Sequence, residues 1–438
     1  MSGGTEGPAR DGSVYGIDGL AHDELAALVR EQLLIGQLID RAGMPALLAE
    51  FGLEGMRDVA IEEWQAASPH YALRMKRALG ISGDGVAEIF KGFQLDIGAP
   101  PEFMDFRYTV HDHDHGEFHL DHCGALMDVE PMGDQLVKVM CHDIEDPTFP
   151  ATAFATNPRA VVEPVHRPPR SPAGRTPHCQ WTVRIDADAP PAELPAPAAE
   201  SASAAAVSLE FPEPAAGEDP REGLLADYSG PLLSDLHFPD FDRAALVRIA
   251  REVALQMHLL ALGFAQAVRR RSDTDTAVRL LRYQCTGISG VATGRIAAAL
   301  GVTAADGPAG LARIFSLHPI AAPAEYTGFS MALRDDGEGL DLHWAAEAPW
   351  WRDEGWAQVL GSGDAGPLEA AARAIDPRYR VDLDVSASGV KAAVLLDPEA
   401  DPDGAEFAER EEVAVTRLSS GAGFEFGPVR RPIPLTPL

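Results

Sequence analysis

Three of the four cysteines lie between positions 123 and 179, and each has a histidine as its sequence neighbour: His122-Cys123, Cys141-His142 and His178-Cys179. Thiolate and imidazole are ligands that zinc, iron and copper accept, and three cysteines with one histidine or aspartate would complete a tetrahedral site. The linear spacing matches no C-x-x-C zinc ribbon. The pattern therefore predicts a zinc or iron site whose ligands are drawn from the three cysteines, His122 and His178.

Asp143 directly follows the middle Cys-His pair. A bound metal would lower the pKa of its water, and Asp143 or His142 would then act as general base toward a small substrate. Without a metal, Cys123 or Cys179 would attack as a thiolate that its neighbouring imidazole activates. The alternatives are a redox pair, which requires two thiols at disulfide distance, and cysteines that only pack as small apolar side chains.

A small basic island precedes Cys179 in an otherwise acidic sequence, and it contains His166, Arg167, Arg170 and Arg175. Arginine binds carboxylates in a bidentate manner. We therefore expect Arg167 and Arg170 to hold a substrate, together with His119 from the strand that leads to Cys123. The alternative is an ordinary solvated loop.

A second group of histidines, His111, His113 and His115, alternates with Asp112 and Asp114. Alternating histidines on one side of a strand can chelate a metal. The turn-forming residues around them instead favour the exposed tip of a hairpin. The role of this run stays open at the level of sequence.

These residues need a sheet to position them. Roughly the first eighty residues show apolar side chains three and four apart, which predicts helices. The apolar period then changes to two. The expected strands cover 103–111, 117–127, 160–167 and 178–186, with a helix at 134–144 between the two pairs. This order predicts a helical subdomain followed by a ββαββ sheet unit.

The same order of features appears twice in the chain. The tetrad ALVR occurs at 27–30 and again at 245–248, and later short matches recur at nearly constant separation. Strands are expected again at 328–333, 340–345, 379–385 and 390–396, with a helix at 368–375. Self-similarity of this kind indicates an internal repeat. We therefore predict an α+β fold made by tandem duplication, with the two copies packed as a pseudo-dimer.

The predicted organisation has five parts: a flexible leader at 1–18, the first repeat at 19–186, an Ala/Pro-rich linker at 187–236, the second repeat at 237–398 and a C-terminal extension at 399–438. Aligning 118–123 with 340–345, and 178–181 with 390–393, leaves the second copy without the thiols. We therefore expect the site in the first repeat and a scaffold in the second.

Strict alternation along the second strand creates a difficulty for a shared site. It places Phe118 and Leu120 on one face and Cys123 on the other, whereas Cys179 shares the phase of the apolar residue Trp181. A bulge near Gly124, or cysteines at strand ends, would be needed to bring the thiols together.

Within about 106–186, the order of motifs resembles the L-2-amino-thiazoline-4-carboxylic acid hydrolase family. The matching elements are Cys123, Cys141-His142-Asp143, Asn157-Pro158, His166-Arg167 and Cys179-Gln180-Trp181. The resemblance implies a cysteine-centred site and ring-opening hydrolysis of a C–N bond in a small cyclic amidine or amide. The non-enzymatic alternative is a metal- or ligand-binding accessory or sensor protein.

Composition limits the partners. Thirty-six Lys and Arg residues oppose 67 Asp and Glu residues, for a formal charge of -31. Such a charge repels nucleic acid and anionic membranes, so a small molecule is the expected partner, and a homo-oligomer stays open. The N-terminus does not show the pattern of a signal peptide, and four cysteines are too few for a disulfide scaffold. Both features favour a cytoplasmic location.

Overall fold

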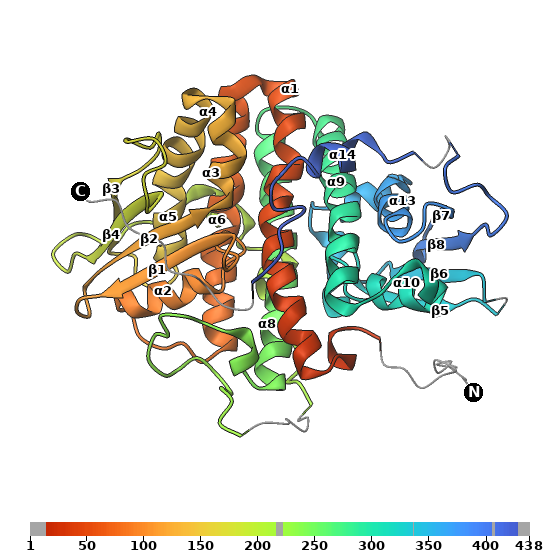
Figure 1. Cartoon of the computed structure of the whole chain (residues 1–438), viewed down its shortest axis with the longest axis horizontal. Coiled ribbons are helices and arrows are strands. Elements are labelled where there is room, and N and C mark those ends of the chain that lie inside the picture. The colour runs from red at the N-terminus through yellow and green to blue at the C-terminus, as the bar shows by residue number, and fades with distance from the viewer. Residues whose placement is uncertain (1–14, 216–221, 336, 405–407, 428–438) are drawn as a thin grey trace.

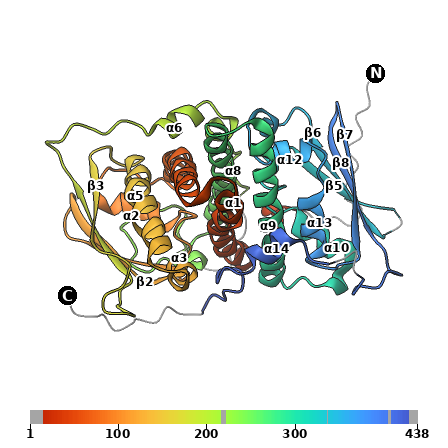
Figure 2. The ribbon, with the colours of Figure 1, turned by 90° about the horizontal axis from the view of Figure 1, so that it is seen from above.

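The computed structural model describes residues 15–215, 222–335, 337–404 and 408–427. It is a mixed helix and sheet structure with two four-stranded antiparallel sheets, as the α+β prediction requires. Figure 1 shows one sheet at each end of the molecule and long helices between them. Figure 2, turned by 90°, shows the same division, with α1, α8 and α9 at the centre.

The first half begins with α1 (His22–Ala78), which is two helices joined at a break. Gly52 has φ 67° and ψ -175° at this break, a backbone conformation that residues with a Cβ rarely adopt. The apolar positions expected from the sequence, such as Leu25, Leu28 and Leu33, are fully buried. The short helix α2 (Val86–Gln94) follows.

The first sheet contains β1 (Met104–Val110), β2 (His115–Cys123), β3 (Ala160–His166) and β4 (Cys179–Ile185), in the spatial order β1-β2-β4-β3. Three strands lie where the period-two pattern predicted them, whereas the strand predicted at 117–127 begins two residues earlier and ends at Cys123, where α3 begins. Phe118, Leu120, Trp181 and Val183 form a buried face with at most 1% exposure each.

Helices α3 (Gly124–Val129), α4 (Asp134–Lys138) and α5 (Glu145–Phe154) connect β2 to β3. Between α4 and α5 the backbone forms a π-helical turn at Val139–Ile144. The helix predicted at 134–144 is therefore present, but it contains a widened turn and continues for ten further residues as α5. Widened turns of this kind occur frequently at functional sites.

The second half has the same order of elements. Its helices are α8 (Arg243–Arg269), α9 (Thr274–Leu300), α10 (Gly307–Phe315), α11 (Ala324–Thr327), α12 (Ala357–Gly361) and α13 (Gly366–Arg373). Its strands are β5 (Phe329–Leu333), β6 (Gly339–Ala345), β7 (Tyr379–Ser386) and β8 (Gly389–Leu396). They form a sheet of order β5-β6-β8-β7, which corresponds strand for strand to the first sheet.

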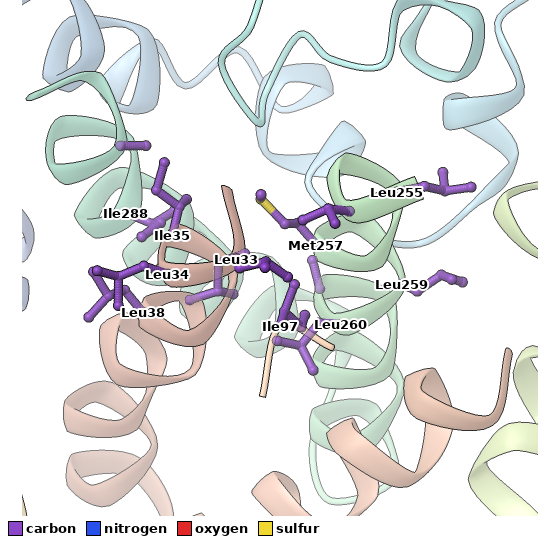
Figure 3. Packing of buried hydrophobic residues seen from close by; sticks show 14 of the residues in the cluster. Leu33, Leu34, Ile35, Leu38, Ile97, Leu255, Met257, Leu259, Leu260 and Ile288 are labelled. Atoms are coloured by element: carbon purple, nitrogen blue, oxygen red, sulfur yellow. The ribbon is translucent and has the colours of Figure 1, made fainter. Parts of the chain in front are cut away.

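Short 3-10 turns complete the described structure at Ile17–Gly19, Glu130–Met132, Phe238–Asp240, Ala304–Asp306 and Pro349–Arg352. The two halves share one continuous apolar core. Figure 3 shows its centre, where Ile35 of α1 lies toward Ile288 of α9 and Leu33 of α1 lies toward Leu260 of α8. Burial of this shared core is the main contribution that stabilises the contact between the halves.

The Ala/Pro-rich segment predicted as a linker is packed onto both halves. It contains α6 (Ala196–Ser201) and α7 (Ala205–Ser208). The Asp353 carboxylate of the second half accepts hydrogen bonds from the backbone amides of Ala205 and Ala206, at 2.8 and 2.9 Å. Arg74 of α1 donates to the Val207 carbonyl at 3.0 Å. The small side chains that suggest a flexible spacer therefore allow close packing instead.

The C-terminal extension returns to the first half after α14 (Glu411–Thr416). Arg295 of α9 donates to the carbonyl oxygens of Gly421 and Phe424, each at 2.9 Å. The Phe424 ring lies 5.3 Å from the Phe103 ring, between centroids. Most of the predicted leader falls outside the described residues; of its described part, Asp18 forms an ion pair with Arg251 at 2.7 Å.

Within the described ranges, no single helix is long and apolar enough to cross a membrane. One bent pair, Thr274–Leu300 with Ala304–Phe315, reaches the required length and composition only when the two helices are taken together, and they meet at 83°.

Candidate functional site

A bulge in β2 brings Cys123 to the inner face of the first sheet. Phe106 lies opposite Leu120, but Met104, two residues earlier on β1, lies opposite Cys123, three residues later on β2. One extra residue on β2 therefore interrupts the alternation, which reverses the faces after it. Cys179 lies opposite Leu120 at the start of β4. Both thiols are thus in the core, at 4% exposure each.

The Glu145 carboxyl influences the pKa of each of the three predicted cysteines. Cys141 lies in the π-helical turn at 3% exposure. Burial raises the pKa of Cys123 to about 12, and the nearby Glu145 adds to this shift. Burial and Glu145 also hold the pKa values of Cys141 and Cys179 well above the ordinary range, with the Cys123 thiol contributing to both. All three thiols are therefore held protonated.

The histidines that adjoin these cysteines in the sequence point away from the thiols. His122 hydrogen-bonds through Nδ1 to the Phe103 carbonyl at 2.9 Å, and His142 through Nε2 to the Pro168 carbonyl at 2.6 Å. The ring of His178 lies 5.9 Å from that of His122. Burial, together with Arg170 and His122, lowers the pKa of His178 to about 4.

Successive strand residues face opposite sides of a sheet, so sequence neighbours separate in space here. Among the described residues, no three His, Cys, Asp or Glu side chains are grouped so that they could hold a metal ion. The zinc or iron site stays a prediction from the sequence.

The predicted base Asp143 lies outside the cavity described below. Its carboxylate is 24% exposed and is shared between Lys138 at 3.5 Å and Arg57 at 3.9 Å. The predicted substrate contacts are also paired with protein groups. Arg167 forms an ion pair with Asp146, Arg170 donates to Glu130 at 2.8 Å, and His119 lies 3.2 Å from Asp121.

The histidine run lies at the exposed tip of the β1-β2 hairpin. His113 and His115 are 63% and 60% exposed, and each hydrogen-bonds an aspartate of the same turn, Asp114 at 2.7 Å and Asp112 at 2.9 Å. This is the exposed hairpin tip that the turn residues favoured.

A partly open cavity of about 100 Å³ lies in the first half, between α1, β1, α3, the π-helical turn and α5. Figure 1 shows these elements together beside the first sheet. Cys141 is the predicted cysteine that lines this cavity, and Glu145 lines it one helical turn later. Its other walls include the aromatic rings of Trp64, Phe93 and Phe149.

Glu145 is an acid of this cavity that the sequence did not single out. Burial raises its pKa to about 8, against the opposing effect of Arg167. In the described part of the chain, its Oε2 atom is buried and has no hydrogen-bond partner. A carboxyl group that changes protonation near neutral pH can act as a general acid or base. The sequence signal for Glu145 was its spacing of four residues from Cys141, which places both side chains on one face of a helix.

Helix α1 contributes Gln37, Asp40 and Arg41, whose spacing places them on one face of the helix. Burial raises the pKa of Asp40, although Arg41 favours the ionised form. Arg41 Nη1 donates to the sulfur atoms of Met44 and Met140, at 3.2 and 3.7 Å.

Asp96 closes the cavity near the α2 end. The Tyr71 hydroxyl donates to its Oδ1 at 2.8 Å, and the Gly98 amide donates to the same atom at 2.6 Å. Burial nevertheless raises the pKa of Asp96 to about 6.

Fold and site together define an α+β protein with a small pocket lined by a thiol, carboxyl groups and aromatic rings. Comparison of the chain with protein-family models, with curated proteins and with solved structures found no match. The resemblance of 106–186 to a hydrolase family therefore stays an expectation based on its motifs.

Proposed function

We propose that this cavity is the active site of a small-molecule hydrolase that breaks a C–N bond without a metal. The observation that carries the proposal is the pair Cys141 and Glu145, which line one cavity, where burial and the Glu145 carboxyl raise the pKa of the Cys141 thiol. Cys141 is the nucleophile and Glu145 the general acid and base. The substrate class implied by the motif resemblance, a small cyclic amidine or amide, agrees with the size of the cavity.

In this mechanism, both groups hold their protons in the resting site because burial raises both pKa values. Glu145 starts in its minor, ionised form and takes the thiol proton as the Cys141 sulfur bonds to the substrate carbon. It then gives that proton to the leaving nitrogen as the C–N bond breaks. Water next attacks the thioester or thioimidate carbon, and Glu145 returns the water proton to sulfur. Atoms and charge balance over the cycle.

The test is turnover of a panel of small cyclic amidines and amides, with ring-opened product detected by mass spectrometry. We expect Cys141→Ala and Glu145→Gln each to lower turnover on the order of 10³-fold, as for paired catalytic groups. Cys285→Ser, a buried thiol of the second half, is the matched control and should turn over normally. Full activity in Cys141→Ala would contradict the proposal.

Asp143→Asn separates this proposal from the sequence-based one. The structure places Asp143 outside the cavity, so we expect its substitution to change turnover less than about threefold, within the range of surface effects. A loss as large as that of Glu145→Gln would favour Asp143 as the base. Elemental analysis of the same preparation tests the zinc or iron prediction, which stays a prediction.

We further propose that the chain arose by duplication, and that the second half is a scaffold. The matching strand orders support this. The observed registers adjust the alignment by one residue, because Leu120 lies opposite Cys179 whereas Leu342 lies opposite Ala392, not Lys391. Neither alignment gives the second half a thiol at this position. Substitutions in its core should therefore lower stability and leave the turnover of folded protein unchanged.

A further inference from the structure

The cavity in the first half contains an excess of unsatisfied hydrogen-bond acceptors. Gln37 Oε1, Asp40 Oδ1 and Glu145 Oε2 are buried and have no hydrogen-bond partner within the described ranges, and all three residues line the cavity. Gln37 and Asp40 are only 5% and 4% exposed. A buried acceptor without a partner costs about 1–3 kcal/mol, so three in one cavity indicate a ligand that donates hydrogen bonds.

The remaining walls suit a positive charge. The rings of Phe93 and Phe149 lie 5.9 Å apart and those of Phe106 and Phe149 lie 6.3 Å apart, and all three residues line the cavity with Trp64. Aromatic faces attract cations through the ring quadrupole, most strongly where water is excluded.

We infer that the cavity binds a small organic cation with several N–H donors, of the amidinium, guanidinium or primary ammonium class. This inference rests on the proposed function, because it names the ligand class of the same site. The carboxyl groups of Asp40, Asp96 and Glu145 supply acceptors, and the aromatic rings enclose the apolar part of the ligand.

The arginine in the cavity does not make it an anion site. Arg41 is the one Lys or Arg residue among those that line the described cavity, and its Nη2 lies 3.9 Å from Asp40 Oδ2. An anion bound to Arg41 would lie beside Asp40 and Glu145. Glu63, whose pKa burial raises well above its ordinary range, adds a further acid behind Asp40.

The charged and titratable groups near Glu145 come from every surrounding element. They are Arg41 of α1, Asp146 of α5, Arg167 after β3, and the thiols of Cys123, Cys141 and Cys179. The two arginines favour its ionised form, whereas burial and Asp146 oppose it. The free site therefore holds a proton on Glu145 at neutral pH, and a bound cation favours release of that proton.

Three probes of one molecular shape test the inference on the full chain. Acetamidinium is a cation with four N–H donors, acetamide is its neutral analogue, and acetate is its anionic analogue. We expect acetamidinium alone to raise the melting temperature and to bind in calorimetry at pH 8.5. Its Kd should rise up to tenfold for each pH unit below about 8, because binding then releases one proton.

Two cavity variants and one control complete the experiment. Glu145→Gln should weaken acetamidinium binding at least tenfold at pH 8.5 and remove most of the pH dependence, and Asp40→Asn should weaken it as well. The control is Glu54→Gln, which changes an exposed residue of α1, the element that also contains Asp40. This variant should bind acetamidinium like the wild type. Equal binding of acetamide, preferred binding of acetate, or no binding of any probe would overturn the inference.

The outcomes separate this inference from the proposed function. Cys141→Ala should lose turnover but still bind acetamidinium. Acetamidinium binding without any turnover would refute the hydrolase and leave the cation site intact. Turnover that depends on Cys141 and Glu145, in a protein that binds acetate in preference to acetamidinium, would refute the cation site alone.

Discussion

Replacement of Glu145 by Gln should change how the stability of the protein depends on pH. The Glu145 carboxyl ionises near 4.5 in the unfolded chain and near 8 in the folded cavity, because burial disfavours its charge. Between these values the folded state binds more protons than the unfolded state, so stability falls as pH rises. The contribution is fully present below about pH 4.5 and is lost by about pH 8. Glutamine has nearly the same shape and does not titrate.

The magnitude follows from the size of the shift. One pKa unit corresponds to about 1.4 kcal/mol, so the free energy of unfolding of the wild type should fall by up to that amount for each pH unit, relative to Glu145→Gln. Between pH 5.5 and 7.5 the difference between the two proteins should change by roughly 3 kcal/mol. Asp96, Asp40 and the histidines are present in both proteins, so their titration cancels in the comparison.

Urea unfolding at pH 5.5, 6.5 and 7.5, followed by tryptophan fluorescence, measures this difference. Glu54→Gln removes an exposed glutamate from the same protein and should track the wild type at all three pH values. A difference between wild type and Glu145→Gln that stays constant to within about 0.5 kcal/mol would refute the reasoning. It would mean that Glu145 is ionised in the folded protein and that its surroundings are polar.

Three further predictions follow from the packing. The four free cysteines are buried, so iodoacetamide at pH 8 should modify fewer than one thiol per native chain in the time that modifies all four in urea; intact mass gives the count, and rapid native labelling would contradict their burial. Gly124→Ala should lower stability by about 1–3 kcal/mol in thermal or urea unfolding, because its Cβ would lie 2.1 Å from the Phe103 ring; an unchanged midpoint would contradict that packing. Arg295→Met should cost about 3 kcal/mol by leaving Glu31 without its buried partner at 2.6 Å. The same variant should be cleaved faster by trypsin after Arg417. If the variant resists trypsin as well as the wild type does, Arg295 does not hold the C-terminal segment in place.

The strands could be predicted from the sequence because one face of each sheet is buried and the other is not. The strand expected at 103–111 is observed at Met104–Val110, and the one expected at 340–345 at Gly339–Ala345. Alternation of apolar and polar side chains is a direct consequence of one-sided burial. The sequence predicted a helix that ends at 144 and did not predict α5, because Pro147 and Pro150 obscure the helical pattern of that segment.

The site was harder to predict, for two physical reasons. The bulge that turns Cys123 inward follows Leu120, where Asp121 and His122 carry no glycine or proline signal. Asp40 and Glu145 are charged residues in helices, a pattern that is typical of solvated helix faces. Which helix face the rest of the chain covers depends on tertiary packing, and the sequence pattern of one helix does not contain it.

Cysteine and histidine residues that are adjacent in the sequence have different surroundings in the fold. Neighbours on a strand diverge to opposite faces, so His178 pairs with His122 by ring contact while Cys179 faces the core. Residues four apart on a helix, such as Cys141 and Glu145, do converge. Helical spacing, rather than adjacency, was the informative pattern in this chain.

The return of the C-terminal segment to the first half has a consequence for biosynthesis. Ser419 hydrogen-bonds Asp128 at 2.6 Å, and Phe424 lies against His122 and Phe103. A domain at the start of a chain can begin to fold while later residues are still being translated. Here the half that contains the cavity gains its last packing contacts only after the whole second half has left the ribosome. The nascent first half therefore lacks the cover that Phe424 gives to Phe103 throughout that interval.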